Sequence, residues 1–228
     1  MNTKRIKTIL FDVGDVLLKK TVNIDEQISS FLGVDLEKYV QRQKGLINSD
    51  KKLQENWQHI ETLEKEILYM NDFNAKLLDV LSIEKTRDKI DFMTACHVKR
   101  SYKLVDGAFE LLNYLNEKYQ LGVISNCLVS RKYYEMKEFD LDKYFDTVVL
   151  SREINIDKPN PGIFLYALEQ VKKEPGECAF IDNKVENLES AKKLGFGELI
   201  FFSKKGRVID VPSGIKRVAS LVELREVF

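Results

Sequence analysis

The chain has 228 residues, and its 36 basic and 36 acidic side chains balance to a formal net charge of zero. Hydrophobic residues make up 44% and charged residues 32%, which is typical of a globular protein and excludes a disordered or fibrous chain. The balanced charge gives no electrostatic reason to expect nucleic acid as a partner. We interpret the short basic clusters at 99–100 and 204–207 as solvated surface.

Cysteine usage and hydropathy indicate a cytoplasmic protein. Cys96, Cys127 and Cys178 are an odd number at no metal-like spacing, so we expect reduced thiols, with neither a disulfide framework nor a zinc site. The first residues lead directly into a strand-like run without a signal-type apolar stretch. No window approaches the roughly 18 apolar residues that a membrane span needs, so we expect no membrane contact. The oligomeric state is not predicted.

Short apolar runs in chain order predict the strands of a parallel sheet, because strands buried on both faces are continuously apolar. Helical patterns at 108–115, 163–171 and 188–194 alternate with these runs, and Gly195 is expected to end the last of them. This alternation predicts an α/β fold with a doubly wound, Rossmann-like parallel sheet. The predicted strands are 6–11, 121–124, 147–150, 178–181 and 199–202.

The stretch from 19 to 103 has no convincing strand pattern. Apolar residues from Leu53 to Met70 recur at spacings of three and four and predict one long amphipathic helix, with further helices near 77–81 and 83–96. We interpret Trp57 in this stripe as core packing. The sequence therefore predicts a helical cap at 19–103, inserted into a core domain made of residues 1–18 and 104–228.

Polar residues follow the predicted strands at their carboxyl ends, where open parallel sheets bind ligands. Asp12 follows the first strand, Ser125 and Asn126 follow the second, and Asp182 follows the fourth. Lys158 lies between the third and fourth strands. Two acids, a hydroxyl and a lysine from four separate segments are thus expected at one edge of the sheet.

These residue types suit phosphoryl transfer. A carboxylate can attack phosphorus and form an aspartyl-phosphate, Mg²⁺ prefers carboxylate and carbonyl oxygens, and a lysine and a hydroxyl stabilise charge on the transferred group. Each residue also has a structural interpretation: Asp12 as a turn acid, Ser125 and Asp182 as caps, and Lys158 as a surface lysine. Their order and placement together favour the site.

Four segments resemble the motifs of the haloacid dehalogenase superfamily, in the family's order and over about residues 5 to 203. They are FDVGDVL at 11–17, VISN at 123–126, KPNP at 158–161, and FIDN at 180–183 followed by Glu186 and Asn187. The resemblance implies a hydrolase with a magnesium cofactor, a small phosphorylated substrate and, at 19–103, a cap of the C1 type. The first motif is also similar to that of a sugar-phosphatase-like branch, which has an Asp-x-Gly-x-Val pattern.

The resemblance also implies roles for individual positions. Asp12 would be the nucleophile and a magnesium ligand, and Lys158 would pair with both the nucleophile and the phosphate. Ser125 and Asn126 would bind the phosphate. Asp182 would be the second carboxylate on magnesium.

Three positions in the motifs depart from the family pattern or need a separate role. Gly14 stands where phosphatases of the family carry a second aspartate as general acid and base, although its backbone carbonyl would still serve magnesium. Asp15 occupies a position that is usually glycine. Asn183 replaces a second aspartate, and we assign Asp15 and Asn183 to the outer shell of the site. Loss of general acid–base help is worth roughly a hundred- to ten-thousand-fold in rate.

Two alternative functions stay open. A non-catalytic relative that binds a phosphorylated ligand or a protein partner is favoured by Gly14 and Asn183, and opposed by the four retained residues of the site. A metal-independent dehalogenase would attack carbon from Asp12, but that branch generally has an aromatic residue at position 14.

Overall fold

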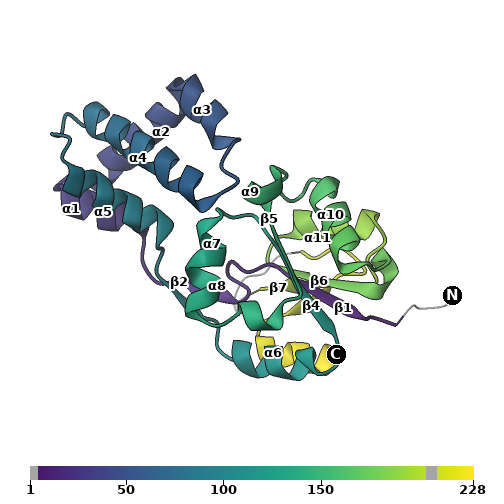
Figure 1. Cartoon of the computed structure of the whole chain (residues 1–228). Coiled ribbons are helices and arrows are strands. Elements are labelled where there is room, and N and C mark those ends of the chain that lie inside the picture. The colour runs from purple at the N-terminus through teal and green to yellow at the C-terminus, as the bar shows by residue number, and fades with distance from the viewer. Residues whose placement is uncertain (1–4, 204–209) are drawn as a thin grey trace. The chain divides into compact units, whose positions relative to one another are not determined.

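The computed structural model describes residues 5–203 and 210–228, so the basic cluster predicted at 204–207 lies outside the described residues (Figure 1). The chain divides into two compact units, each described here by itself. The first unit contains Met1–Lys19, Lys103–Cys127 and Phe139–Phe228, and the second contains Lys20–Tyr102 and Leu128–Glu138. The second unit thus includes a segment, 128–138, that the sequence analysis assigns to the core. Among the described helices, none has the length and apolar character that crossing a membrane requires.

The first unit is built on a six-stranded sheet in the order β5-β4-β1-β6-β7-β8, and every neighbouring pair is parallel. The α/β class with a doubly wound parallel sheet is thereby confirmed. All five predicted strands are present, whereas the three-residue β8 escaped prediction because two of its residues are exposed. The strands are β1 (Thr8–Phe11), β4 (Gln120–Ser125), β5 (Thr147–Leu150), β6 (Cys178–Asp182), β7 (Glu198–Phe202) and β8 (Lys216–Val218).

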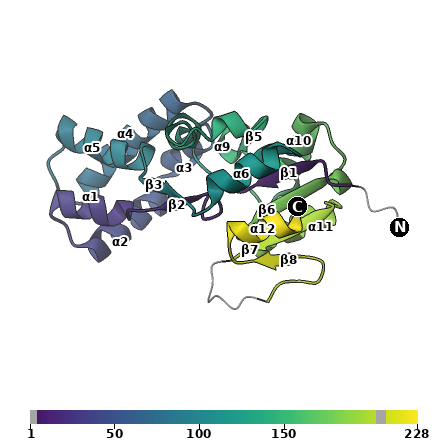
Figure 2. The same ribbon diagram turned by 90° about the horizontal axis from the view of Figure 1, so that it is seen from below.

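Helices cover both faces of this sheet. The views in Figures 1 and 2 show α6 (Ala108–Asn116) and α12 (Leu221–Val227) on one side, while α10 (Pro161–Val171) and α11 (Val185–Lys193) lie on the other. Short helical turns complete the unit: α9 (Ser151–Ile154), η1 (Asp142–Tyr144) and η2 (Pro175–Glu177). Gly195 follows α11 with φ +86°, a left-handed conformation that suits glycine, as expected for the end of this helix.

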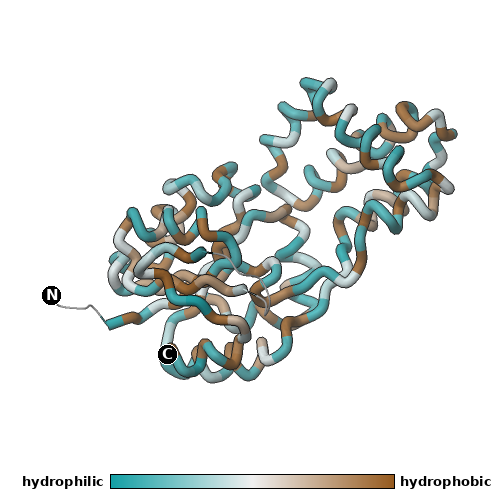
Figure 3. The backbone as a smooth tube through the Cα atoms, turned by 180° about the vertical axis from the view of Figure 1, so that it is seen from behind, coloured by the Kyte–Doolittle hydropathy of each residue, from teal (hydrophilic) through white to brown (hydrophobic). Residues whose placement is uncertain are grey.

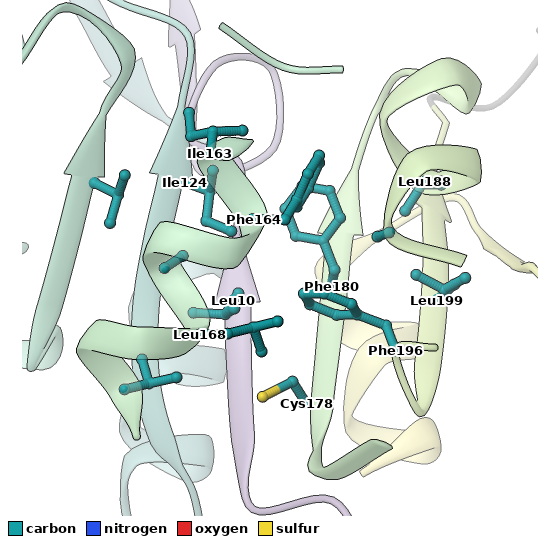
Figure 4. Packing of buried hydrophobic residues seen from close by; sticks show 14 of the residues in the cluster. Leu10, Ile124, Ile163, Phe164, Leu168, Cys178, Phe180, Leu188, Phe196 and Leu199 are labelled. Atoms are coloured by element: carbon teal, nitrogen blue, oxygen red, sulfur yellow. The ribbon is translucent and has the colours of Figure 1, made fainter. Parts of the chain in front are cut away.

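The main core of the first unit lies between the sheet and the pair α10 and α11. Phe164, Phe180 and Phe196 meet edge to face there, with ring centroids 5.3 to 6.3 Å apart (Figure 4). Aromatic pairs in this arrangement add stability beyond the area that they bury. Hydrophobic colour in Figure 3 accordingly follows the strands, whereas it alternates with hydrophilic colour along the helices. This core holds the central strands rigidly in register.

The second unit is helical. Its helices are α1 (Ile24–Leu32), α2 (Leu36–Ser49), α3 (Lys51–Trp57), α4 (Leu63–Val80), α5 (Arg87–Val98), α7 (Ser130–Tyr133) and α8 (Glu135–Glu138). A core of buried residues, among them Ile28, Tyr39, Leu77 and Met93, joins α1, α2, α4 and α5. Most residues of two short strands, β2 (Leu18–Lys20) and β3 (Tyr102–Leu104), belong to the first unit, and the two strands pair as a separate sheet.

The prediction of one long helix from Leu53 to Met70 is wrong, because two helices occupy this stretch. The first ends at Trp57, and Thr62 caps the second by accepting a hydrogen bond from the Lys65 N–H at 3.2 Å. The apolar spacing continues across the break because Ile60, in the connection, is itself buried. The apolar spacing therefore continues past Thr62 and gives no sign that a new helix begins there. The helix expected near 77–81 is the end of α4.

A buried carboxylate attaches α7 to α4 within the second unit. Glu66 is fully buried, and its Oε2 accepts a hydrogen bond of 2.8 Å from the Ser130 N–H. Burial raises the pKa of Glu66, against the lowering effect of this hydrogen bond and of Arg100. An apolar cluster of Met70, Val98 and Leu128, with Tyr134 packed against it, also joins 128–138 to the helices.

Two substitutions of Glu66 distinguish the effect of its hydrogen bond on stability from the effect of its charge. Because the pKa of Glu66 is raised in the folded chain, the folded state binds this proton more tightly than the unfolded state does. The free energy of unfolding therefore decreases as the pH rises above 4.5, the ordinary pKa of the carboxyl group. We expect Glu66→Gln to retain or increase the free energy of unfolding at pH 7, and Glu66→Leu to lower it by about 1–3 kcal/mol, because the Ser130 N–H loses its partner. Urea denaturation measures both; equal losses in the two variants would contradict this account.

A buried histidine makes the stability of the second unit depend on pH. Burial, with a smaller contribution from Arg100, lowers the pKa of His97 from 6.5 to about 4. Since the unfolded chain takes up this proton first, stability is present above pH 6.5 and is lost as the pH falls towards 4. Relative to His97→Gln, we expect the wild type to lose on the order of 3 kcal/mol between pH 7 and 4. Urea titrations of both proteins across this range test it, and parallel curves would rule out His97 as the cause.

Candidate active site

Three of the predicted site residues stand at the carboxyl ends of three adjacent central strands. Asp12 follows β1 directly, Ser125 is the last residue of β4, and Asp182 is the last residue of β6. In the sheet, β1 lies between β4 and β6 and is parallel to both. Because the strands run in the same direction, their ends bring these side chains to one edge, within the first unit.

A buried lysine joins the two carboxylates at this edge. The Nζ of Lys158 donates to Asp12 Oδ1 at 3.0 Å, to Asp182 Oδ2 at 2.7 Å and to the backbone oxygen of Ile124 at 2.7 Å. Lys158 is only 5% exposed. An ammonium group has three N–H donors, and here each has an acceptor. The cation is therefore fully satisfied without solvent.

Burial and charge act in opposite directions on this cluster. Burial favours the neutral form of Lys158, but Asp12 and Asp182 together outweigh it and hold the pKa of the lysine above its ordinary value. Burial raises the pKa of Asp182, and the Asp12 charge adds to this, whereas Lys158 lowers it. Two carboxylates face one ammonium, so the cluster carries an excess negative charge that favours a further cation.

Asp12 retains one oxygen for chemistry. Its Oδ1 accepts hydrogen bonds from Lys158 and from the Ser125 hydroxyl, the latter at 3.1 Å. Its Oδ2 takes part in no hydrogen bond among the described residues, and the side chain is 12% exposed. Both donors act on the same oxygen, so they hold the carboxylate in place and leave the other oxygen able to bind or attack.

Asn126 has partners that the sequence does not reveal. Its amide nitrogen donates to the Lys158 backbone oxygen at 2.8 Å, and its side-chain oxygen accepts from the Lys158 N–H at 2.7 Å. This paired contact fixes the backbone of Lys158 beside the end of β4. The predicted role of Asn126 as a phosphate ligand stays a prediction, while its observed contacts are those of a residue that positions Lys158.

Asn187, which is not among the predicted site residues, contacts Asp182. The Asn187 amide donates to Asp182 Oδ2 at 2.9 Å, and the Lys184 N–H donates to Asp182 Oδ1 at 2.8 Å. Asn187 is 3% exposed and lies at the start of α11. The only sequence signal for it is an asparagine in the first turn of the helix that follows Asp182. These donors hold both oxygens of Asp182 in a fixed orientation.

The three remaining predicted positions lie in loops outside this hydrogen-bonded cluster. Gly14 is half-buried, and Asp15 is exposed with φ +60°, the left-handed region that glycine favours. The family's preference for glycine at position 15 thus has a backbone cause, and aspartate is among the residues that tolerate this conformation. Asn183 is half-buried, and its side chain makes no hydrogen bond among the described residues.

The donor set at this edge fits magnesium better than zinc. Among the described residues, no three histidine, cysteine or acidic side chains gather as a metal site. Magnesium is commonly held by one or two carboxylates, with water and substrate phosphate completing its octahedral shell, whereas structural zinc takes four protein ligands. Asp12 and Asp182 supply two carboxylates that converge on one point, the Nζ of Lys158.

The chain is similar to known proteins over most of its length. The family model described as haloacid dehalogenase-like hydrolase matches residues 9–199. The HAD-hydrolase YfnB of Bacillus subtilis is 24% identical over 186 residues, which are 78% of this chain and 75% of the relative. A D-ribitol-5-phosphate phosphatase of Bacteroides thetaiotaomicron is 23% identical over 204 residues, 84% of this chain and 89% of the relative.

Solved structures share the fold over nearly the whole chain. The 2-haloacid dehalogenase from Pseudomonas syringae pv. Tomato DC3000 gives a TM-score of 0.74 at 18% identity and covers 97% of each chain. Bacillus subtilis YfnB, in a structure bound to magnesium, gives a TM-score of 0.65 at 19% identity and covers 98% of this chain and 99% of that chain. At such identities the likeness shows the fold alone. Because the family model extends from the first strand of the sheet to β7, however, the chain belongs to the haloacid dehalogenase-like hydrolase family.

Proposed function

We propose that this hydrolase is a magnesium-dependent phosphatase that cleaves the monoester of a small phosphorylated metabolite through an aspartyl-phosphate on Asp12. The observation that carries the proposal is the Lys158 ammonium, which bonds to both Asp12 and Asp182. A cation at this point suits an anionic substrate, because it offsets repulsion between the attacking carboxylate and the phosphate oxygens. The phosphatase relative of similar length supports the substrate class.

In the proposed reaction, the free Oδ2 of Asp12 attacks phosphorus while the bond from phosphorus to the leaving oxygen breaks. The Ser125 hydroxyl and Lys158 hold the other oxygen, Oδ1, and so keep Oδ2 directed outward. Water then attacks the phosphorus of the aspartyl-phosphate, which releases phosphate and restores the Asp12 carboxylate. The nucleophile thus replaces one difficult displacement at phosphorus by two easier ones.

The residues present fit the proposed metal. Asp12, Asp182 and the backbone carbonyl of Gly14 would hold magnesium, which when bound neutralises charge on the phosphoryl oxygens. The excess negative charge of the cluster favours such a cation. Asp182 is already oriented for this task by Asn187 and by the Lys184 N–H. We retain the helical insertion at 19–103 as a C1-type cap within this proposal.

The leaving oxygen needs a proton that residue 14 cannot supply, because Gly14 has no side chain. Asp15 is exposed and lies in a left-handed turn, which disfavours its carboxylate as a replacement for the missing aspartate at position 14. This feature favours slow turnover, and it is also the observation that keeps a non-catalytic, phosphate-binding role as the second candidate. The two differ in whether phosphate is released at all.

A substrate panel with one pair of variants separates these functions. With magnesium, we expect phosphate release from at least one sugar phosphate, nucleotide or small phosphorylated acid. Asp12→Asn should reduce the rate by on the order of 10⁴-fold or more, because it removes the nucleophile. Asp15→Asn tests the displaced carboxylate separately. We expect it to change the rate less than about ten-fold, whereas loss of a general acid would slow the reaction roughly a hundred-fold or more. Colorimetric phosphate assays measure all three proteins.

The pattern of phosphate release distinguishes the candidate functions. Release that persists in Asp12→Asn would overturn the nucleophile assignment, and release without magnesium would overturn the metal. Binding of phosphate by a folded protein without any release would support the non-catalytic role. Halide release from a haloacid without magnesium would instead support a dehalogenase.

The electrostatic role of Lys158 has a readout that does not need turnover. Lys158→Met leaves two carboxylates close together without their cation, so we expect the free energy of unfolding to fall by about 3–5 kcal/mol without metal. Added magnesium should raise the melting temperature of this variant more than that of the wild type, because the cluster has become more negative. Lys193→Met, at an exposed lysine on α11, is the control and should behave as wild type. An equal magnesium response in Lys158→Met and wild type would contradict a metal at this cluster.

A further inference from the structure

The second unit contains a cavity of its own. It has a volume of about 450 Å³ and lies among α2, α3, α4 and α5, with all its lining residues between positions 43 and 97. Pockets that bind small molecules have volumes of roughly 300–1,000 Å³ and are lined mainly by apolar and aromatic side chains. This cavity is therefore large enough for a small ligand.

Aromatic rings form much of the cavity wall. Trp57 and Tyr69 meet edge to face with centroids 5.3 Å apart, and Tyr69 lies nearly parallel to Phe73, at 6.3 Å. Phe73 is 5% exposed, whereas Ile47 at the rim is 42% exposed. The cavity wall thus combines one buried ring, Phe73, with two half-buried rings, Trp57 and Tyr69, and the edge at Ile47 is accessible. The interpretation of Trp57 as core packing is incomplete, because this residue also lines a cavity.

The polar groups of the lining carry no charge at neutral pH. They are the amides of Gln43, Gln54 and Gln58, the Trp57 indole N–H, the Tyr69 hydroxyl and the imidazole of His97, which burial keeps neutral with a pKa of about 4. Gln54 donates from its amide nitrogen to the backbone oxygens of Ile47 and Asn48, which leaves its Oε1 without a partner among the described residues. The Nε2 atom of His97 is also buried without a hydrogen-bond partner there.

We propose that this cavity binds a small uncharged aromatic molecule, with its ring against Trp57, Tyr69 and Phe73 and an N–H or O–H group donating to Gln54 Oε1. Aromatic rings favour stacked or edge-to-face partners, which this wall offers. An anion is disfavoured, because it would lose its hydration in a cavity whose lining supplies no cation. The site differs in this respect from the Lys158 cluster, and the proposal does not depend on the phosphatase function.

The single tryptophan of the chain reports directly on the cavity. Benzamide and benzoate are suitable probes, since they have the same shape and differ in charge, and benzamide has the N–H donor. We expect benzamide to shift the NMR signal of the Trp57 indole N–H in a saturable way. Benzoate should bind weaker by on the order of ten-fold or more, because of its charge.

A pair of variants assigns the binding to this cavity. Ile47→Asp places a carboxylate at the rim and should weaken benzamide binding by about five-fold or more, because the ligand then buries a charge. Leu68→Asp is the matched control at a position on α4 that is 61% exposed and outside the lining, and it should leave binding unchanged. Circular dichroism confirms that both variants are folded.

Three results would overturn the proposal: no saturable shift with benzamide, equal affinity for benzamide and benzoate, or equal loss in the two variants. If Ile47→Asp fails to fold, the comparison of the two probes on the wild-type protein decides the question alone.

Discussion

The site depends on one buried ammonium group. Lys158 bonds to the carboxylate that follows β1, to the carboxylate of the last residue of β6 and to the backbone oxygen of Ile124 in β4, so one cation connects the ends of the three central strands. Without it, Asp12 and Asp182 would be two buried like charges at one edge of the sheet, an arrangement that costs several kcal/mol. The paired contacts of Asn126 with the Lys158 backbone therefore matter as much as the ammonium itself, because they hold the lysine where its charge is needed.

This arrangement constrains how the site can act. All three donors of Lys158 are already used, so the ammonium can assist a phosphate only by sharing or exchanging an existing acceptor. Asp12 has its free oxygen because both of its hydrogen bonds fall on Oδ1. Asp182, by contrast, accepts hydrogen bonds at both oxygens, and it is the more rigidly held of the two acids. This difference in hydrogen bonding suits the proposed roles, in which Asp12 is the nucleophile and Asp182 a fixed metal ligand.

The sequence predicted most of the sheet and the convergence of four site residues, because parallel strands bring residues at their carboxyl ends to the same edge wherever those strands lie in the order. What it missed depends on tertiary contacts or on short segments. The break between α3 and α4 was concealed by Ile60, which keeps the apolar spacing although it lies in a connection. The partners of Asn126 arise from a loop 32 residues away and leave no local signal. Asn187 lay inside a quoted motif, but only its burial and its bond to Asp182 identify its task.

The loop after β1 holds Asp15 in a closed backbone turn. The Asp15 N–H donates to the backbone oxygen of Leu18, and the Leu17 and Leu18 N–H groups both donate to the backbone oxygen of Val13, so the turn is closed on itself. Asp15 sits in this turn with φ +60°, and moving its carboxylate to the place of a neighbouring side chain would require the turn to open. Its backbone bonds and the buried side chains of Val13 and Leu17 oppose such a change. For the proposed phosphatase, this closed turn favours a general acid from outside the loop: water, a group on the substrate or a residue elsewhere in the chain.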